Sequence, residues 1–478
     1  MSVSTEVLAR PLCVALDRTL IRGDLQLESL LRLLKLSPLY LFPTLLWMVR
    51  GKAVLKAQVA ARVSIDPATL PYDELFLAWL RGEHAAGRKL WLCTAANEKS
   101  ACEVAEHLGI FAGVIASDSR VDLAGERKAQ ALVERFGCGG FDYCGNERRD
   151  LAVWRSAHGA IVVNATAALQ RRVGAELPVL RSFSRAHSGV RPVLRVLRPH
   201  QWAKNVLLLV PLLAAHRVAD VGALRAVLLG LVSFCLCTSS MYVLNDLLDL
   251  GVDRAHPRKS LRPFASGQVS VATGLALSPA LLAAGLTISL ILSMKFLVAL
   301  VAYCALALAY SFIFKRFVVI DVLALAGLYT LRIIAGAGAA NVALSFWLLL
   351  FSVFLFLSLA LVKRYAELLA LRRQQRLQAL GRGYRIEDLA VLRSFGTASG
   401  YLSVLVLGLY INSPEIRELY HHPRAVWMVC IIMLYWISRV WMTAHRGGMQ
   451  DDPVIYALRD PVSVALGVLA AVVVMAAI

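Results

Sequence analysis

The sequence predicts an α-helical polytopic membrane domain preceded by a soluble, doubly wound α/β domain. The 478-residue chain is 58% hydrophobic and only 17% charged, with a mean hydropathy of +0.63, unlike an ordinary soluble enzyme. After residue ~200, apolar runs recur that approach or reach the roughly 17–25 residues needed to cross a bilayer. The first ~185 residues instead alternate short apolar runs with helix-like segments, as a globular domain does.

The net charge of +19 does not indicate a nucleic-acid partner, because no recognition motif accompanies it. Basic loops that face anionic lipid and anionic substrates account for such a charge in a membrane protein. The nine cysteines form no C-x-x-C pair and indicate a reducing compartment. Arg10 and Asp17 interrupt the early apolar stretch, so we expect no signal peptide.

Residues 1–180 are expected to form the soluble domain. Short apolar runs predict buried parallel strands, and periodic segments between them predict helices, which together give a sheet with ligands at the carboxyl ends of its strands. The expected strands are 11–16, 89–94, 112–116, 141–145 and 160–164, and the expected helices are 98–108, 126–136 and 148–157.

A helical insertion at about 22–85 separates the first two strands. Within it, residues 39–49 (LYLFPTLLWMV) are too short to cross a membrane and contain Pro43. This segment is either a core or cap helix, or a helix on the bilayer surface flanked by Arg50, Lys52 and Lys56.

Residues 181–199 are expected to be a basic juxtamembrane linker, followed by a transmembrane domain at 200–478. If the amino end is cytosolic, the loops between the expected helices that face the cytosol hold most of the basic residues. The loops on the opposite side hold little beyond Arg217, Lys295 and Arg417. The positive-inside rule therefore predicts a multi-pass protein of the bacterial inner membrane, with its soluble domain and active site facing the cytosol. About nine transmembrane helices are expected, near 201–215, 222–248, 272–292, 296–313, 318–338, 345–362, 396–412, 424–442 and 461–478.

The strongest chemical pattern is NDLLDLGVDRAHPRKSLRPFASG, residues 245–267. Oxygen-bearing side chains recur there every three or four residues, which on a helix puts them on one face. Such a stack repels itself unless a cation lies within it, and its hard oxygen ligands suit Mg²⁺ shared with substrate phosphates. Basic residues follow at once and supply the charge that a Mg²⁺–diphosphate needs. The predicted metal ligands are Asn245, Asp246, Asp249 and Asp253, and the predicted catalytic residues are Asp246, Asp249, Asp253, Arg258, Lys259 and Arg262.

This pattern resembles the first aspartate-rich motif of the UbiA-type intramembrane prenyltransferase superfamily. The stretches LRPHQWAKN (197–205), YSFIFK (310–315), KRYAEL (363–368) and DDPVIYALRD (451–460) are similar to its polyprenyl-phosphate phosphoribosyltransferase branch, of which decaprenyl-phosphate phosphoribosyltransferases are the known type. Where the superfamily has a second aspartate-rich motif, this chain has the single acid Asp321, with Leu325 in the place of another. This departure favours phosphoribosyl pyrophosphate (PRPP) over a prenyl diphosphate as the donor.

The resemblance implies Mg²⁺-dependent transfer of 5-phosphoribosyl from PRPP to a polyprenyl phosphate, with release of pyrophosphate. The alternatives are a prenyltransferase that uses a prenyl diphosphate on another acceptor, and a non-catalytic lipid-binding scaffold. The acceptor and the oligomeric state, including a homo-oligomer, stay open. The further residues expected to bind substrate are Lys204, Asn205, Asn245, Tyr310, Lys315, Lys363, Arg364, Tyr365 and Arg459.

The segment CVALDRTLIRGD, residues 13–24, resembles the first motif of haloacid dehalogenase-like phosphatases, a likeness that extends over about residues 8–175. Ala15 stands at the position of the nucleophilic aspartate, so no aspartyl-phosphate can form. Asn146 likewise replaces an acid that would hold Mg²⁺. The resemblance thus implies a catalytically dead phosphatase fold, a pseudophosphatase, with a structural or docking role; residual phosphatase activity is left open. The remaining positions match the family's pattern: Asp17, Thr94, Lys128 and Asp150.

Overall fold

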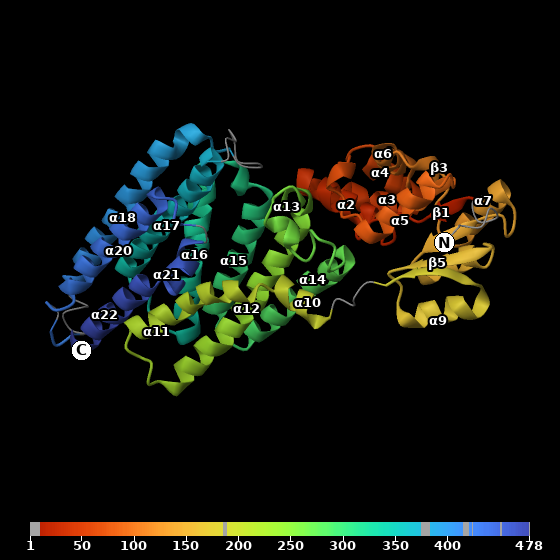
Figure 1. The fold of residues 1–478 in the computed structure, drawn as a ribbon. Helices are drawn as coiled ribbons and strands as arrows, with labels where there is room; N and C mark the ends of the chain where they lie inside the picture. The colour runs from red at the N-terminus through yellow and green to blue at the C-terminus, as the bar shows by residue number, and fades with distance from the viewer. Residues whose placement is uncertain are drawn as a thin grey trace. The chain divides into compact units, whose positions relative to one another are not determined.

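The fold is given by a computed structural model, which describes residues 10–184, 189–373, 383–413, 420–422, 424–449 and 452–477 (Figure 1). Arg417 lies outside these described residues. The chain divides into two compact units. Unit 1 comprises residues 1–197 and 243–277, and unit 2 comprises residues 198–242 and 278–478. This division places the acidic segment 245–267 with the N-terminal residues, although its position in the sequence predicts that it belongs to the membrane domain.

A six-stranded parallel sheet forms the centre of the N-terminal part of unit 1. Its strand order is β3-β2-β1-β4-β5-β6, which reverses direction next to β1, so that the carboxyl ends of β1 and β4 border a natural ligand-binding crevice. The five predicted strands are confirmed. The sixth strand lies where a linker was expected and extends the sheet to Phe183. The strands are β1 Leu12–Val14, β2 Leu90–Asn97, β3 Phe111–Ser117, β4 Asp142–Gly145, β5 Gly159–Val163 and β6 Val179–Phe183.

Helices cover both faces of this sheet, as the doubly wound prediction requires. Leu12 and Val14 point into one core with α5 and α6, whereas Cys13 and Ala15 point into the other with α7, α8 and α9. Both cores are apolar because the residues of a buried parallel strand are apolar on each face. The helices are α5 Glu74–Ala85, α6 Glu98–Leu108, α7 Glu126–Phe136, α8 Leu151–Trp154 and α9 Ala167–Glu176.

The predicted insertion between β1 and β2 is helical. Its first helix begins after Asp24, whose side chain accepts a hydrogen bond from the Leu27 N–H and so caps the first turn. A short helix, α10 Val190–Val196, follows β6 in the segment expected to be a linker. The insertion contains α2 Leu25–Leu36, η1 Pro38–Tyr40, α3 Leu41–Arg50, α4 Lys52–Ala60 and η2 Pro67–Thr69 before α5.

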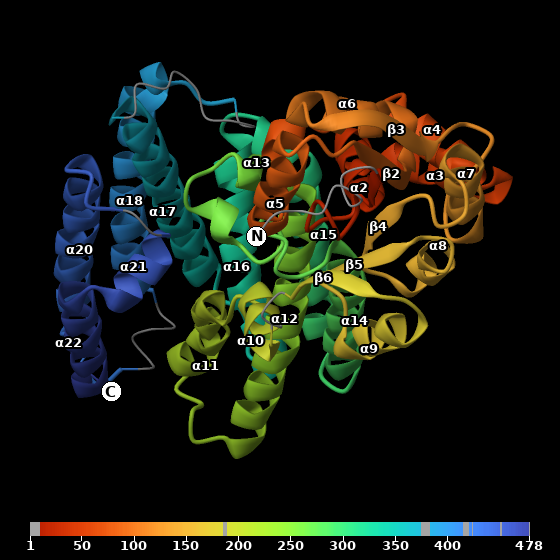
Figure 2. The same ribbon diagram turned by 45° about the vertical axis from the view of Figure 1, so that its right-hand side comes forward.

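Unit 2 is a bundle of long apolar helices, and Figure 2 shows α16, α17 and α18 side by side. Helix α12 begins in unit 2 and ends in unit 1, and α14 begins in unit 1. The elements are η4 Pro199–Leu209, α11 Val210–Ala214, α12 Val221–Leu248, α14 Val271–Leu290, α15 Met294–Phe312, η6 Phe314–Arg316, α16 Ile320–Ala340, α17 Phe346–Arg373, η7 Ile386–Asp388, α18 Leu389–Ile411, α20 Trp427–His445, α21 Pro453–Arg459 and α22 Pro461–Ala477.

Seven helices of the described residues are long and apolar enough to cross a membrane, or eight if α21 and α22, bent by 79°, count as one span. The sequence predicts about nine. The difference lies at 201–215, where η4 and α11 form short pieces that contain Pro211 and the buried polar residues Lys204 and Asn205. No single helix of 18 residues forms there.

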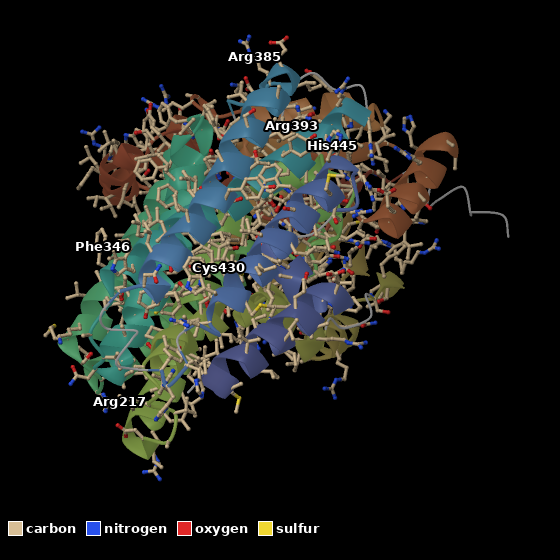
Figure 3. All side chains as sticks on the ribbon, turned by 90° about the vertical axis from the view of Figure 1, so that its left-hand side faces the viewer. Arg217, Phe346, Arg385, Arg393, Cys430 and His445 are labelled. Carbon is tan, nitrogen blue, oxygen red and sulfur yellow. The ribbon has the colours of Figure 1, made fainter. Side chains whose placement is uncertain are left out.

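Small residues allow the helices of unit 2 to pack closely. A Cβ on Gly336 would lie 2.1 Å from the Leu208 carbonyl oxygen, and one on Gly338 would lie 2.9 Å from the Phe296 nitrogen. Both glycines are therefore packing contacts. In Figure 3, Arg385 and Arg393 lie at the same end of unit 2 as His445, and Arg217 and Phe346 lie toward the other end.

Candidate functional site

The acidic segment of unit 1 is a helix end followed by a tight loop. Helix α12 ends at Leu248, Asp249 leaves helical geometry, and the short helix α13 Leu250–Arg254 continues the chain. The His256 ring then accepts hydrogen bonds from the backbone N–H groups of Arg258 and Lys259. His256 thus shapes the loop. The short helix η5 Lys259–Leu261 contains Lys259 and is flanked by Arg258 and Arg262.

Arg262 brings two of the predicted carboxylates together. One of its guanidinium nitrogens donates to Asp253 Oδ2 at 2.6 Å and to Asp246 Oδ1 at 3.1 Å. Both carboxylates are about 4% exposed. Burial raises the pKa of Asp253 above its ordinary value, against the lowering effect of the Arg262 guanidinium. The site is therefore one in which an additional positive charge would be stabilising.

The third predicted carboxylate, Asp249, is held by a residue that the sequence analysis did not single out. Lys35, in the last turn of α2, places its Nζ 2.8 Å from Asp249 Oδ1. Arg254, at the end of α13, forms a second ion pair with α2, to Glu28 in its first turn. Figure 1 shows α2 beside α13 within unit 1.

The donor chemistry of this loop fits Mg²⁺, which takes oxygen ligands, keeps several waters and is usually held by one or two carboxylates together with substrate phosphates. Asp246 and Asp253 converge on one cationic nitrogen, which marks the point where a metal would be held. Among the described residues, however, no three His, Cys, Asp or Glu side chains lie close enough together to hold a metal ion. The four-ligand set with Asn245 and Asp249 therefore stays a prediction, and Arg262 has to move for a metal to bind.

The other basic residues of the loop differ in exposure. Arg258 is exposed and Lys259 is partly buried. Neither side chain is engaged with Asp246, Asp249 or Asp253 by any hydrogen bond or ion pair within the described segment.

Unit 2 contains a second charged cluster, centred on Asp452. Asp452 Oδ2 accepts from Lys204 Nζ at 2.7 Å and from Lys363 Nζ at 3.1 Å, and Tyr329 donates to Asp452 Oδ1 at 3.0 Å. Burial raises the pKa of Asp452, but the two ammonium groups outweigh it and hold the pKa well below its usual range. Two cations thus share one carboxylate. Asp451, its sequence neighbour, lies outside the described residues.

Asn205 has a structural role in unit 2. Its side-chain oxygen accepts from Arg332 Nε at 2.9 Å, and its amide nitrogen donates to Thr238 Oγ1 at 3.2 Å. Arg332 also donates to the Tyr303 hydroxyl at 3.0 Å. Asn205 is 1% exposed, so a substrate can reach it only if this network opens.

Arg364 is likewise engaged on all three of its nitrogens. It contacts Asp321 at 2.5 Å, Glu367 at 2.6 Å and the Tyr310 hydroxyl at 2.8 Å. Tyr384 donates to the other Asp321 oxygen. Asp321 is fully buried, so the single acid in the region of the expected second motif balances a buried guanidinium.

The remaining predicted substrate ligands are dispersed over unit 2. Tyr365 lies 2.8 Å from His445 through its hydroxyl and the ring Nδ1. Lys315 is partly buried in η6, and Arg459 is exposed in the last turn of α21. Within the described part of the chain, the side-chain hydrogen bonds of Asp452 go to Lys204, Tyr329 and Lys363 instead.

The degenerate positions of the N-terminal part do gather at the carboxyl ends of β1, β2 and β4. Asp17 Oδ1 accepts the Leu25 N–H at 2.7 Å, and burial together with the nearby Asp24 carboxylate raises the pKa of Asp17 to about 7. Thr94 accepts the Ala96 N–H at 3.0 Å. Ala15 is buried and supplies only a methyl group.

Asp150 anchors the other half of that region. It accepts from the Tyr143 hydroxyl at 2.9 Å and from the backbone N–H groups of Asn146 and Glu147 at 3.0 Å each. Lys128 lies 3.5 Å from Asp150 and donates to Tyr143. These partners give Asp150 and Lys128 a structural role in this arrangement.

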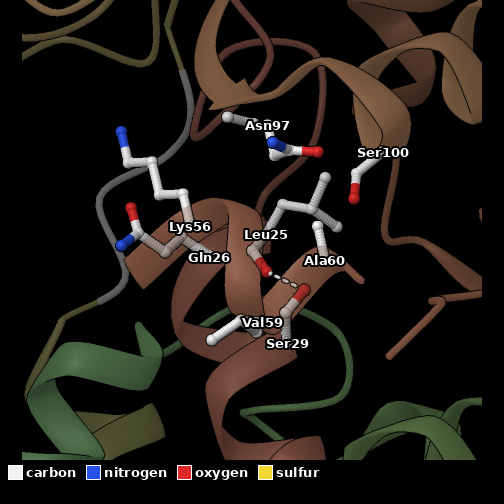
Figure 4. A pocket seen from close by; sticks show the side chains of 9 residues that line it. Leu25, Gln26, Ser29, Lys56, Val59, Ala60, Asn97 and Ser100 are labelled. Atoms are coloured by element: carbon white, nitrogen blue, oxygen red, sulfur yellow. Dashed lines mark hydrogen bonds between the residues drawn. The ribbon is translucent and has the colours of Figure 1, made fainter. Parts of the chain in front are cut away.

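A small pocket beside this region does not add a catalytic group. It is bordered by Leu25 and Ser29 of α2, and Figure 4 shows the Ser29 hydroxyl bonded to the Leu25 carbonyl. Lys56 borders it too, but its Nζ is paired with Asp122 at 2.6 Å. The pocket lies between α2, α4 and the carboxyl end of β2.

Three residues that carry the described charge networks were missed by the sequence analysis: Arg332, Glu28 and Lys35. An arginine in an otherwise apolar transmembrane helix is functional or structural by default, so Arg332 could have been found. Glu28 and Lys35 look like ordinary surface charges of an amphipathic helix, and nothing local distinguishes them.

Comparison with known proteins gives matches over both parts of the chain. Residues 206–458 match the family model described as the UbiA prenyltransferase family. An uncharacterized protein, y4nM, of Sinorhizobium fredii is 37% identical over 465 residues, which cover 96% of this chain and 90% of that protein. The nodulation protein NoeC of Azorhizobium caulinodans is 38% identical over 55% of this chain and 85% of its own length. The decaprenyl-phosphate phosphoribosyltransferase of Mycolicibacterium smegmatis is 34% identical over 57% of this chain and 88% of its own length.

Proposed function

Because the chain belongs to the UbiA prenyltransferase family, we propose that it is a membrane transferase that moves the 5-phosphoribosyl group of PRPP onto a polyprenyl phosphate. The observation that carries this proposal is the acidic loop of unit 1, where the buried carboxylates of Asp246 and Asp253 lie on one short segment with the basic residues Arg258, Lys259 and Arg262. The similarity to a decaprenyl-phosphate phosphoribosyltransferase supports PRPP as the donor.

The state of Asp321 favours PRPP over a prenyl diphosphate. A second aspartate-rich motif needs a carboxylate that can reach a metal, whereas Asp321 is fully buried and bound by Arg364 and Tyr384. One acidic cluster is sufficient for one Mg²⁺–diphosphate. A polyprenyl phosphate carries only a monophosphate and needs no second cluster.

In the proposed reaction, the bond from ribose C1 to pyrophosphate breaks and a bond from C1 to a polyprenyl-phosphate oxygen forms. Mg²⁺, when bound, would neutralise the pyrophosphate oxygens. Asp246 and Asp253 would hold the metal, and Arg258, Lys259 and Arg262 would stabilise the negative charge that develops on the leaving group. Since the acceptor is ionised at neutral pH, no general base is required.

The Lys204–Asp452–Lys363 cluster is our candidate for the anionic head group of the lipid. Lys363 is 31% exposed on its side chain and Lys204 is 9% exposed. A phosphate would replace Asp452 as the partner of Lys363 at small cost, because both are anionic oxygen acceptors. Arg364 and Asn205 would support this cluster without contacting the lipid.

Purified protein in nanodiscs with Mg²⁺ separates the candidate reactions. PRPP with polyprenyl phosphate should release pyrophosphate and form a phosphoribosyl lipid, and a prenyl diphosphate with the same acceptor should not. Turnover with the prenyl diphosphate alone would favour the prenyltransferase alternative. No turnover with either donor would favour a lipid-binding scaffold.

The contacts within unit 1 also bear on the membrane topology. Glu28 and Lys35 contact the loop that follows α12, so residues 10–184 and that loop belong on the same side of the bilayer. Since α12 crosses once, η4 and α11 have to supply a second crossing. At about 2.0 Å per residue for η4 and 1.5 Å for α11 they extend over about 30 Å, the thickness of the hydrocarbon core. Since most of the basic residues also lie in loops on this side, the positive-inside rule would make it the cytosolic side of a bacterial inner membrane.

For the N-terminal part we propose a phosphatase-like fold without phosphatase chemistry that docks on the bilayer. Ala15 and Asn146 support the loss of chemistry. Helix α3 supports docking: Phe42 is 70% exposed and Val49 is 87% exposed, and Leu39, Leu45 and Leu46 of the same surface are exposed as well. The first residue of this face, Leu39, lies four residues after Lys35, whose partner Asp249 comes directly after the end of the α12 span. The apolar face of α3 would enter the lipid interface, with Arg50 and Lys52 at the head groups.

A further inference from the structure

We propose that helix α2 of the N-terminal part is a positioning element of the transferase, in which Glu28 fixes the acidic loop and Lys35 is the counter-ion of Asp249 before metal binds. This inference rests on the proposed function, because it assigns the acidic loop to diphosphate binding. It gives the catalytically degenerate N-terminal part a role in the reaction. All of its contacts lie within unit 1.

Glu28 holds the loop through a bidentate ion pair. The two Arg254 terminal nitrogens donate to the two Glu28 oxygens at 2.6 and 2.8 Å, and Arg254 Nε donates to the Ala265 carbonyl at 3.1 Å. The Arg254 and Glu28 side chains are 6% and 4% exposed. Arg254 therefore ties both ends of the loop, at 254 and 265, to the first turn of α2.

Two glycines permit this close approach. A Cβ on Gly23 would lie 2.2 Å from Glu28 Oε1 and 3.6 Å from an Arg254 nitrogen. On the loop side, Gly267 has φ +66° and a Cβ there would lie 2.6 Å from the Arg22 Cβ. The N-terminal part and the loop thus meet at Arg22, Glu28 and Lys35, which makes the contact an extended interface.

Lys35 acts at the other end of the same helix. Glu28 and Lys35 are seven residues apart, two helical turns, and so share one face of α2. Lys35 Nζ is 2.8 Å from Asp249 Oδ1, with both side chains about one-fifth exposed. An ammonium group at this distance satisfies the carboxylate and competes for it with a divalent cation, since both bind the same oxygen.

The competition has a measurable consequence. Replacing Lys35 by methionine removes the competing charge and keeps the length of the side chain, so the loop should bind a divalent cation more tightly. For a partly exposed pair worth on the order of 1 kcal/mol, the gain is about fivefold. If Lys35 had only a structural role, its replacement by methionine would weaken or abolish the binding of the divalent cation to the loop.

The test uses full-length protein in nanodiscs and Mn²⁺ as the probe, with free Mn²⁺ measured by electron paramagnetic resonance in the presence and absence of inorganic pyrophosphate. We expect Lys35→Met to lower the Mn²⁺ Kd about fivefold, Lys35→Arg to restore the wild-type Kd, and Arg32→Ala, an exposed position on the same helix, to leave it unchanged. An unchanged or higher Kd in Lys35→Met, or no Mn²⁺ binding by any variant, would overturn the inference.

A second readout tests Glu28. Glu28→Gln keeps the shape and removes the charge, and we expect hydrogen exchange of loop peptides 249–267 to become at least tenfold faster, with no change in β4 and β5. Unchanged exchange in the loop would overturn the role of Glu28. Neither readout uses PRPP, so a protein that shows both effects but no phosphoribosyl transfer would refute the proposed function alone.

Discussion

Loss of the Arg254 guanidinium should loosen the acidic loop more than any other single change outside the predicted metal ligands. In Arg254→Met, the Glu28 carboxylate stays buried at 4% exposure without its partner. Breaking a buried ion pair in this way costs about 3–5 kcal/mol. Since 1.4 kcal/mol is tenfold, the local opening equilibrium should rise by a factor of about 10² to 4 × 10³.

Hydrogen exchange of the full-length protein in nanodiscs measures this effect on the peptides of α2 and of residues 249–267. The matched control is Arg32→Met, which removes an exposed arginine from the same helix. The double variant Glu28→Met with Arg254→Met should recover most of the loss, because no charge is then left buried. A change below about tenfold in Arg254→Met, or a double variant as destabilised as the single one, would refute the reasoning.

Two further predictions concern the N-terminal part. The pKa of Asp17 is raised to about 7 in the folded state, above its unfolded value of about 3.9, so its ionisation destabilises the fold progressively as pH rises from about 4 to 7. Asp17→Asn should therefore raise stability by up to about 4 kcal/mol at pH 8, at about 1.36 kcal/mol for each unit of pKa shift, and leave it unchanged at pH 4. Thermal unfolding measures this, and equal effects at both pH values would contradict it. A fluorescent label at Phe42→Cys should be quenched by brominated lipids, whereas one at Leu75→Cys, an equally exposed apolar position on α5, should not; equal quenching would argue against docking through α3.

Local patterns predicted the elements of the N-terminal part well. Helices α6 and α7 have the predicted bounds, because each is amphipathic and is followed by a glycine with positive φ, Gly109 and Gly137. Strand β6 was missed, since its exposed residues Leu180, Arg181 and Ser182 show no buried apolar run. An edge strand needs only its hydrogen bonds to β5.

The candidate site was predicted only in part, for a physical reason. The spacing of the acids in residues 245–253 was enough to single them out. Carboxylates three or four residues apart share one helix face and repel one another, and this follows from neighbouring positions in the sequence. Their partners Lys35 and Glu28 are 214 and 226 residues away from Asp249 and Arg254. Contacts at such separation leave no periodic pattern, and only the fold of unit 1 brings them together.

A structure of the protein in nanodiscs with Mg²⁺ and a non-reactive PRPP analogue tests the central claim most directly. The account predicts the pyrophosphate of the analogue at Asp246 and Asp253, with the Arg262 guanidinium displaced from between the two carboxylates onto a phosphate oxygen. An analogue bound elsewhere, with Arg262 still bridging Asp246 and Asp253, would contradict it.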